Sequence, residues 1–225
     1  MKNKPIHIVF FFLALFATQM LYAQRIEHFY TQMPDVLNPV MSRLQRIELL
    51  ENFKAGTSDS IQNRFGTQTR MLKFDAENNH IVLQNTEIST FEMKLIPLRN
   101  DTIIGIIRTV CSPICRSSIE FFSLQWQPRT DITFTFPQAQ DWINEERLNE
   151  SALNAQHTRY ALQTSFISLA FNAETSEIRA TNNSLQFLDQ AQQELLAPIM
   201  NDAVFIYRLG DNRQWERQGH TDNTD

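Results

Sequence analysis

The chain has 225 residues, a formal net charge of −5 and 42% hydrophobic residues. A chain of this length and composition is typical of a globular protein with a sizeable core, not of a disordered one. Its acidic balance gives no electrostatic reason to bind nucleic acid. We therefore expect one globular domain without a nucleic-acid partner.

Residues 1–23 have the layout of a secretory signal peptide. Lys2 and Lys4 precede an uninterrupted apolar run at residues 8–17, and this basic-then-apolar order is typical of export signals. The run is shorter than the roughly 20 residues that a membrane-spanning helix needs. We expect cleavage after Ala23, with an earlier cut or an uncleaved signal anchor as alternatives. The mature protein is then periplasmic or extracellular and does not span a membrane.

Residues 28–55 are predicted to be helical, because apolar residues recur there at steps of three and four. Pro34 and Pro39 interrupt this pattern, and proline fits the first turn of a helix but not its interior. We expect a helix that starts after Pro34 or breaks near Asn38. A second helix is expected over residues 43–54.

Residues 68–136 are predicted to form a β-meander. Short β-favouring runs separated by polar turns occur at 70–74, 80–84, 91–95, 103–110, 119–124 and 132–136. Their connections are too short for parallel crossovers, so neighbouring strands must be antiparallel. The run 91–95 alternates apolar and polar residues and predicts a half-buried strand, whereas 103–110 predicts a more central one.

Residues 140–210 are predicted to contain a covering helix or loop, a hairpin, a second helix and a strand. The hairpin is expected from residues 162–171 and 177–181, and the last strand from 203–209. The chain from 24 to 212 is thus predicted to be a single α+β domain, with an antiparallel sheet of about nine strands and helices packed on it. Residues 213–225 are expected to be a polar tail.

Cys111 and Cys115 are the only cysteines, and they flank the segment 112–114 between two predicted strands. A closely spaced pair in an exported protein favours a structural disulfide, and Pro113 bends the chain between the thiols. A redox-active pair is the weaker interpretation, because the spacing is not Cys-x-x-Cys.

The sequence assigns no catalytic, cofactor-binding or metal-binding residue. The mature chain's four histidines lack zinc-site spacing and are His28, His80, His157 and His220. The acidic segment 75–79 is predicted to be a hairpin turn, because it lacks the glycine and twelfth-position glutamate of a calcium loop. No nucleophile elbow or phosphate-binding loop is present.

Five aromatic residues near the end of the meander have two interpretations. They are Phe121, Phe122, Trp126, Phe134 and Phe136. We expect them to form part of the sheet core, and lining a cavity for an apolar ligand is the alternative.

Several short motifs, taken in order, resemble one known family. They are residues 33–35, 46–50, 91–98, 109–115 and Trp126. Together they look like the domain-of-unknown-function family 3256, a group of exported proteins from Bacteroidales, over about residues 27–209. The resemblance implies an envelope or secreted location and carries no known activity. Ser112 stands where the family pattern often has glycine, which puts a tight turn at that position in doubt.

These observations favour a non-enzymatic envelope protein that binds a protein or glycan partner, with an exposed apolar patch or free sheet edge instead of a deep polar cleft. One alternative is a periplasmic hydrolase-like enzyme whose site assembles dispersed acids such as Asp101 or Glu120. It predicts a buried acid or histidine with a strongly shifted pKa in the largest pocket. Another alternative is a carrier of a small apolar ligand.

Overall fold

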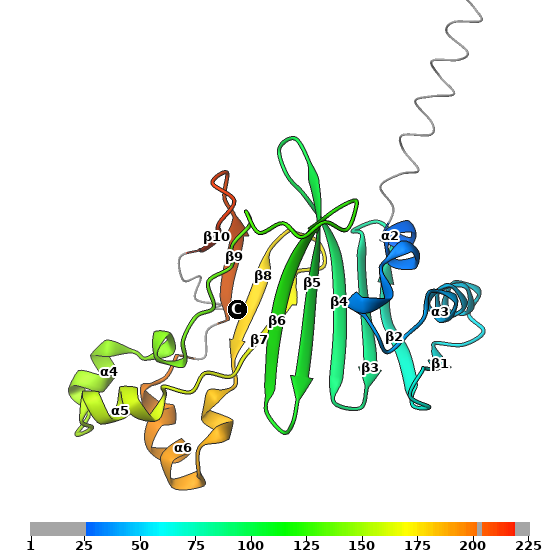
Figure 1. Cartoon of the computed structure of the whole chain (residues 1–225). Coiled ribbons are helices and arrows are strands. Elements are labelled where there is room, and N and C mark those ends of the chain that lie inside the picture. The colour runs from blue at the N-terminus through cyan, green and yellow to red at the C-terminus, as the bar shows by residue number, and fades with distance from the viewer. Residues whose placement is uncertain (1–25, 202–203, 219–225) are drawn as a thin grey trace, which may run out of the picture.

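The computed structural model describes residues 26–201 and 204–218, so the predicted signal peptide and His220 lie outside the described residues. Helices and two antiparallel sheets make up the fold (Figure 1). The predicted α+β class is confirmed. The strands form two sheets, however, instead of the one that we expected.

The larger sheet is a six-stranded meander in which every strand pairs with its neighbour in sequence. Its strands are β1 Ser60–Gln62, β2 Gln68–Asp75, β3 His80–Thr86, β4 Ser89–Pro97, β5 Thr102–Cys111 and β6 Cys115–Ser123. The short connections allow only this antiparallel order. The smaller sheet has the order β10-β9-β8-β7. Its strands are β7 Ile167–Phe171, β8 Ile178–Asn182, β9 Phe205–Leu209 and β10 Trp215–Arg217.

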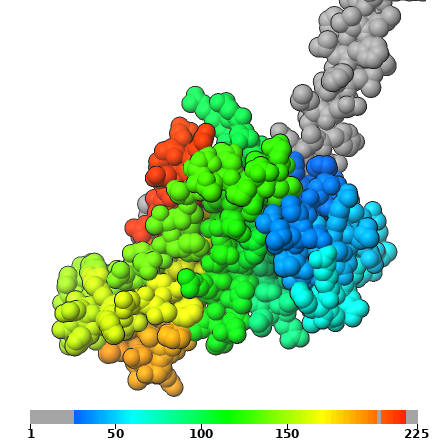
Figure 2. Space-filling view, viewed as in Figure 1, coloured from blue at the N-terminus to red at the C-terminus, as the bar shows by residue number. Residues whose placement is uncertain are grey.

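The helices are short and belong to two groups. The first group is α2 Ile26–Gln32, the 3-10 turn η1 Asp35–Leu37 and α3 Arg43–Ala55. The second is η2 Ala139–Trp142, α4 Glu145–Glu150, α5 Ala155–Ala161, η3 Ser184–Phe187, α6 Gln190–Leu196 and η4 Ala197–Ile199. In Figure 2 the first group and the second group lie on opposite sides of the strands.

The ends of α3 follow directly from its sequence. Ser42 caps the first turn reciprocally: its Oγ accepts from Gln45 N–H at 3.3 Å, and its own N–H donates to Gln45 Oε1 at 2.9 Å. Gly56 ends the helix with φ 67°, a left-handed conformation that glycine adopts without strain. The helix expected to start after Pro34 is absent: α2 ends at Gln32, before the proline, and Asp35–Leu37 forms only the 3-10 turn η1. The helix expected over residues 43–54 is confirmed as α3.

Arg46 of α3 is fully buried and holds the N-terminal segment together. Its guanidinium donates to Tyr30 O at 3.1 Å, to Met41 O at 3.0 Å and to Met33 O. Buried carbonyls need such donors, because an unsatisfied polar group in a core is costly. One side chain therefore fixes α2, α3 and the chain between them.

Strand β5 is covered on both faces, which explains why its sequence does not alternate cleanly. Ile104 and Ile106 belong to the core beneath α2 and α3, while Ile103 and Ile107 belong to the core shared with the smaller sheet. A strand buried on both sides has no polar face. The larger sheet is thus the middle layer of the molecule.

Strand β7 lies over the face of β4 to β6, with its edge towards the larger sheet. Two of its outward N–H groups bond side chains of that face: Leu169 N–H to Ser117 Oγ at 2.8 Å, and Phe171 N–H to Glu92 Oε1 at 2.9 Å. Unpaired edge groups are a liability for a sheet, and here buried polar side chains satisfy them.

Three expected element boundaries also need correction. Residues 132–136 form no strand, because their backbone makes one isolated bridge, Thr133 to Gln214, while Phe134 and Phe136 pack into the core. Residues 162–166 also lie outside the strand that begins at Ile167. The polar tail starts later than residue 213, since Trp215 is buried in β10 and stacks on Phe121.

Candidate functional site

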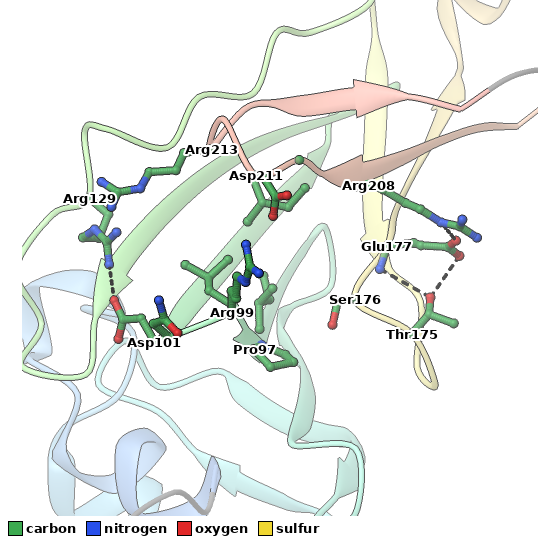
Figure 3. Close-up of a pocket in the computed structure, with 15 residues that line it drawn as sticks. Pro97, Arg99, Asp101, Arg129, Thr175, Ser176, Glu177, Arg208, Asp211 and Arg213 are labelled. Atoms are coloured by element: carbon green, nitrogen blue, oxygen red, sulfur yellow. Dashed lines mark hydrogen bonds and ion pairs between the residues drawn. The ribbon is translucent and has the colours of Figure 1, made fainter.

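A groove of about 620 Å³ lies where three hairpin turns of the two sheets meet (Figure 3). The turns are residues 98–101 between β4 and β5, 172–177 between β7 and β8, and 210–214 between β9 and β10. The charged residues that line the groove are Arg99, Arg129, Arg208, Arg213, Asp101, Glu177 and Asp211. The larger and the smaller sheet therefore build this site together.

Arg129 forms one end of the groove through two carboxylates. It bonds Asp101 Oδ2 at 2.7 Å through Nη1, and both oxygens of Asp131 at 2.9 and 3.1 Å through Nε and Nη2. Arg213 contacts Asp131 from the β9–β10 turn. The Arg129 hydrogen bonds hold the pKa of Asp131 well below its usual range, and the same pairing raises the pKa of Arg129. This end is a fixed network of charges.

Glu177 forms the other end together with Arg208 and Thr175. Glu177 Oε1 accepts from Arg208 Nε at 2.6 Å, and Oε2 accepts from Thr175 Oγ1 at 2.9 Å. Burial of Glu177 disfavours its charge, but the bonds from Arg208 and Thr175 outweigh burial and lower the pKa of this carboxyl. Glu177 is therefore a carboxylate at neutral pH and has no proton to donate.

Arg99 and Asp211 lie between these two ends, as Figure 3 shows. Both side chains are exposed, and neither makes a side-chain hydrogen bond or an ion pair to any residue that the structure describes. The centre of the groove thus presents one unpaired guanidinium and one unpaired carboxylate. These groups can donate to and accept from a ligand at the same time.

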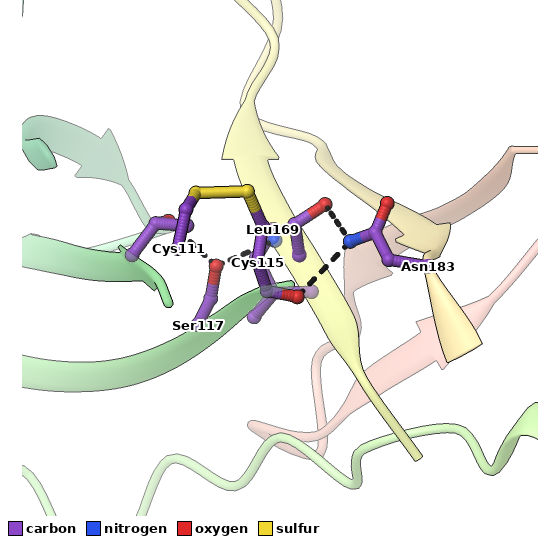
Figure 4. The surroundings of a disulfide bond; sticks show 7 residues. Cys111, Cys115, Ser117, Leu169 and Asn183 are labelled. Atoms are coloured by element: carbon purple, nitrogen blue, oxygen red, sulfur yellow. Dashed lines mark hydrogen bonds between the residues drawn. A yellow bond between two sulfur atoms is a disulfide. The ribbon is translucent and has the colours of Figure 1, made fainter. Parts of the chain in front are cut away.

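Cys111 and Cys115 lie opposite each other at the closed end of the β5–β6 hairpin, with their sulfurs 2.00 Å apart (Figure 4). Asn183 donates to Cys115 O at 3.1 Å. Ser117, two residues further on, holds Leu169 of β7. The hairpin end therefore contacts the smaller sheet.

The histidines do not gather into a site. Among the described residues, no group of three His, Cys, Asp or Glu side chains could hold a metal ion. His80 is buried and contacts Glu92, with His80 Nε2 2.6 Å from Glu92 Oε1. The segment 75–79 forms the predicted turn between β2 and β3, where Asp75 accepts from Asn78 N–H at 2.9 Å.

The acids and aromatic residues named in the sequence analysis do not lie together in one site. Asp101 lies in the groove, whereas Glu120 pairs with Arg108 across β6 and β5. Phe122 and Trp126 lie in the core beneath α2 and α3, and the other three aromatic residues belong to the core shared with the smaller sheet. Their expected role as core is confirmed.

Two further hollows differ from the groove in position and lining. One of about 240 Å³ lies beside β6 and is lined by four of the five aromatic residues, Phe121, Phe122, Phe134 and Phe136. It is smaller than the roughly 300 to 1,000 Å³ of ligand pockets, so it gives the apolar carrier little support. The other, of about 710 Å³, lies between α2 and α3.

Comparison with known proteins places the chain by family and fold. A family model described as Protein of unknown function (DUF3256) matches residues 18–213. The chain belongs to this family. A solved domain of an uncharacterized protein from Porphyromonas gingivalis W83 has a similar fold, with a TM-score of 0.71 and 20% identity, covering 86% of this chain and 98% of that one. A search of curated proteins found no match.

Membership of this family identifies the chain without assigning an activity to it. Among the described helices, none combines the length and the apolar character needed to cross a membrane.

Sequence reasoning missed the groove because its charged residues come from turns far apart in the chain. Asp101 is the one groove residue that the sequence analysis names, and neither its partner Arg129 nor Asp131, the second acid bound to Arg129, belongs to a recognisable motif.

Proposed function

We propose that this chain is exported and acts outside the cytoplasm as a non-enzymatic binding domain, whose groove receives a protein or glycan partner. The observation that carries the proposal is geometric: Glu177 and Asp101, the acids at the two ends of the groove, are bonded to Arg208 at 2.6 Å and to Arg129 at 2.7 Å. Arginines hold Glu177 and the adjoining Asp131 as carboxylates and lower the pKa of each. A hydrolase of the general acid type needs the opposite, an acid whose pKa is raised towards neutrality.

The shape of the groove also supports binding. Its volume falls in the range of ligand pockets, and two of its ends are already fixed by ion pairs. Because these walls are already ordered, the protein loses less conformational entropy when a ligand binds. Arg99 and Asp211 remain available at the centre. The expectation that the contact surface is an apolar patch or a free sheet edge instead of a polar cleft was wrong for this site, since a groove lined by charged residues carries the contact groups.

Export is supported by independent features. The first 23 residues have the layout of a signal peptide. Cys111 and Cys115 lie at disulfide distance, and structural disulfides persist mainly in oxidising compartments. A binding domain of this kind would meet its partner in the cell envelope or outside the cell.

Site-specific photo-crosslinking in cells of the native host tests the proposal. A crosslinking side chain replaces Asn100, which lies in the groove and makes no side-chain hydrogen bond within the described chain. The control position is the exposed Gln192 of α6. We expect a discrete adduct from position 100 that position 192 does not give. Equal adducts from both positions, or none from either, would contradict the proposed site.

A further inference from the structure

Two charged residues of β4 are buried where the sequence predicts solvent contact. Glu92 and Lys94 keep only 8% and 3% of their surface exposed. They alternate with Phe91 and Met93, which face α2 and α3, so both point towards the smaller sheet. Burying charges without a partner is strongly unfavourable, and apolar residues of similar volume often fill such positions at no loss of stability. Their presence therefore calls for an explanation in what they contact.

Both side chains bind the backbone at the end of β7. Glu92 Oε1 accepts from Phe171 N–H at 2.9 Å, and Lys94 Nζ donates to Ala173 O at 2.8 Å. The Lys94 ammonium also donates to Asn78 O at 3.2 Å. Phe171 is the last residue of β7, so these two bonds fix the point at which the strand enters its turn.

The turn itself is held by its own hydrogen bonds, so its base sets the position of its tip. Asn172 Oδ1 accepts from the N–H groups of Glu174 at 3.0 Å and Thr175 at 3.4 Å. Asn172 N–H donates to Glu177 O at 2.9 Å. Residues 175–177 then line the groove. Buried contacts on β4 thus reach the groove through a rigid turn.

Burial lowers the pKa of Lys94, despite the opposing attraction of Asp75 and Glu92. Lys73 on β2 further disfavours the charge, and His80 is the cross-strand neighbour of Lys94 on β3. A lowered lysine pKa means that the protonated form is less favourable in the folded protein than in the unfolded one. Lys94 therefore makes its bonds to Asn78 and Ala173 against an electrostatic cost of burial.

We propose that Lys94 and Glu92 are positioning residues of the groove, because their bonds to Ala173 and Phe171 hold the β7–β8 turn as its wall. This inference rests on the proposed function only where it concerns binding. The position of the turn can be measured without any ligand.

A comparison of two variants separates positioning from general destabilisation. Lys94→Met removes the bond at the end of β7 next to the groove. Ser117→Ala removes the corresponding bond to Leu169, on the same strand but further from the groove. The first measurement is hydrogen–deuterium exchange of residues 172–177, relative to the rest of β7 and β8, in the full chain. Should Lys94→Met fail to fold, Lys94→Gln carries the same test.

We expect Lys94→Met to accelerate exchange in residues 172–177 at least tenfold more than Ser117→Ala does. We also expect it to lower the crosslinking yield from position 100 several-fold, with Ser117→Ala near the wild-type yield. Equal exchange in the two variants would overturn the inference. If the wild type gives no crosslink at position 100, the proposed function fails, while the exchange comparison still decides whether Lys94 positions the turn.

Discussion

Gly105 of β5 offers a sharp test of how the two sheets pack. A Cβ atom at this position would lie 2.6 Å from Phe171 Cζ and 2.9 Å from Ile96 Cδ1. Neither neighbour can move into solvent, since Phe171 and Ile96 are 4% and 1% exposed. Overpacking of this kind costs about 1–3 kcal/mol, whereas replacing glycine stabilises by only about 0.4–1 kcal/mol through the unfolded state. The clash therefore decides the sign.

With the gain subtracted from the cost, we expect Gly105→Ala to lower stability by about 1 kcal/mol, which corresponds to roughly 2–4 °C in Tm for a chain of this size. Thermal unfolding followed by circular dichroism measures the change. Phe171→Leu removes the ring atom that the new methyl would meet, so the double variant should recover part of the loss. An unchanged or raised Tm for Gly105→Ala, or strict additivity of the two substitutions, would show that β7 does not lie on β5 as described.

Three further substitutions or treatments test other parts of the structure. Arg46→Met leaves the carbonyls of Tyr30, Met33 and Met41 without their donor. Urea unfolding should show that the free energy of unfolding falls by about 3 kcal/mol, and a fall below about 1 kcal/mol would contradict this role. Exported protein alkylated without reduction should carry no label on Cys111 or Cys115, and two alkylated thiols would exclude the bridge. Reduction should lower the free energy of unfolding by about 2 kcal/mol. Burial lowers the pKa of Lys94, so between its folded pKa and the ordinary 10.5 the unfolded state binds more protons than the folded one. The wild type should therefore gain stability relative to Lys94→Met as the pH rises through that window. Parallel curves of stability against pH for the two proteins would contradict this.

The sequence predicts strands well where the chain pairs locally. The turns at 75–79 and 99–101 link strands that are neighbours in sequence, so hydrophobic pattern and turn residues suffice to place them. The same reasoning fails for residues 132–136. Ile132, Phe134 and Phe136 alternate like a strand because their side chains enter a core, but their backbone pairs beside β10 only through the single bridge at Thr133 and forms no ladder.

The groove and its buried supports were beyond sequence reasoning for a related cause. Glu92 and Lys94 alternate with apolar residues, a pattern that predicts contact with solvent. They are buried because β7, almost 80 residues later in the chain, covers that face and needs partners for its edge. Similarly, Arg129 meets Asp101 only through the tertiary fold. Contacts between distant segments leave no period or spacing in the sequence.

The most direct test of the binding proposal is the affinity of the mature domain for the partner captured at position 100. Arg99 is exposed and unpaired in the groove, so Arg99→Gln removes a charge-assisted contact worth about 1.5–3 kcal/mol without disturbing the fold. Calorimetric titration should show binding at least about tenfold weaker for Arg99→Gln than for the wild type, with Gln192→Ala unchanged. Equal affinity for all three proteins would contradict the assignment of the groove as the binding site.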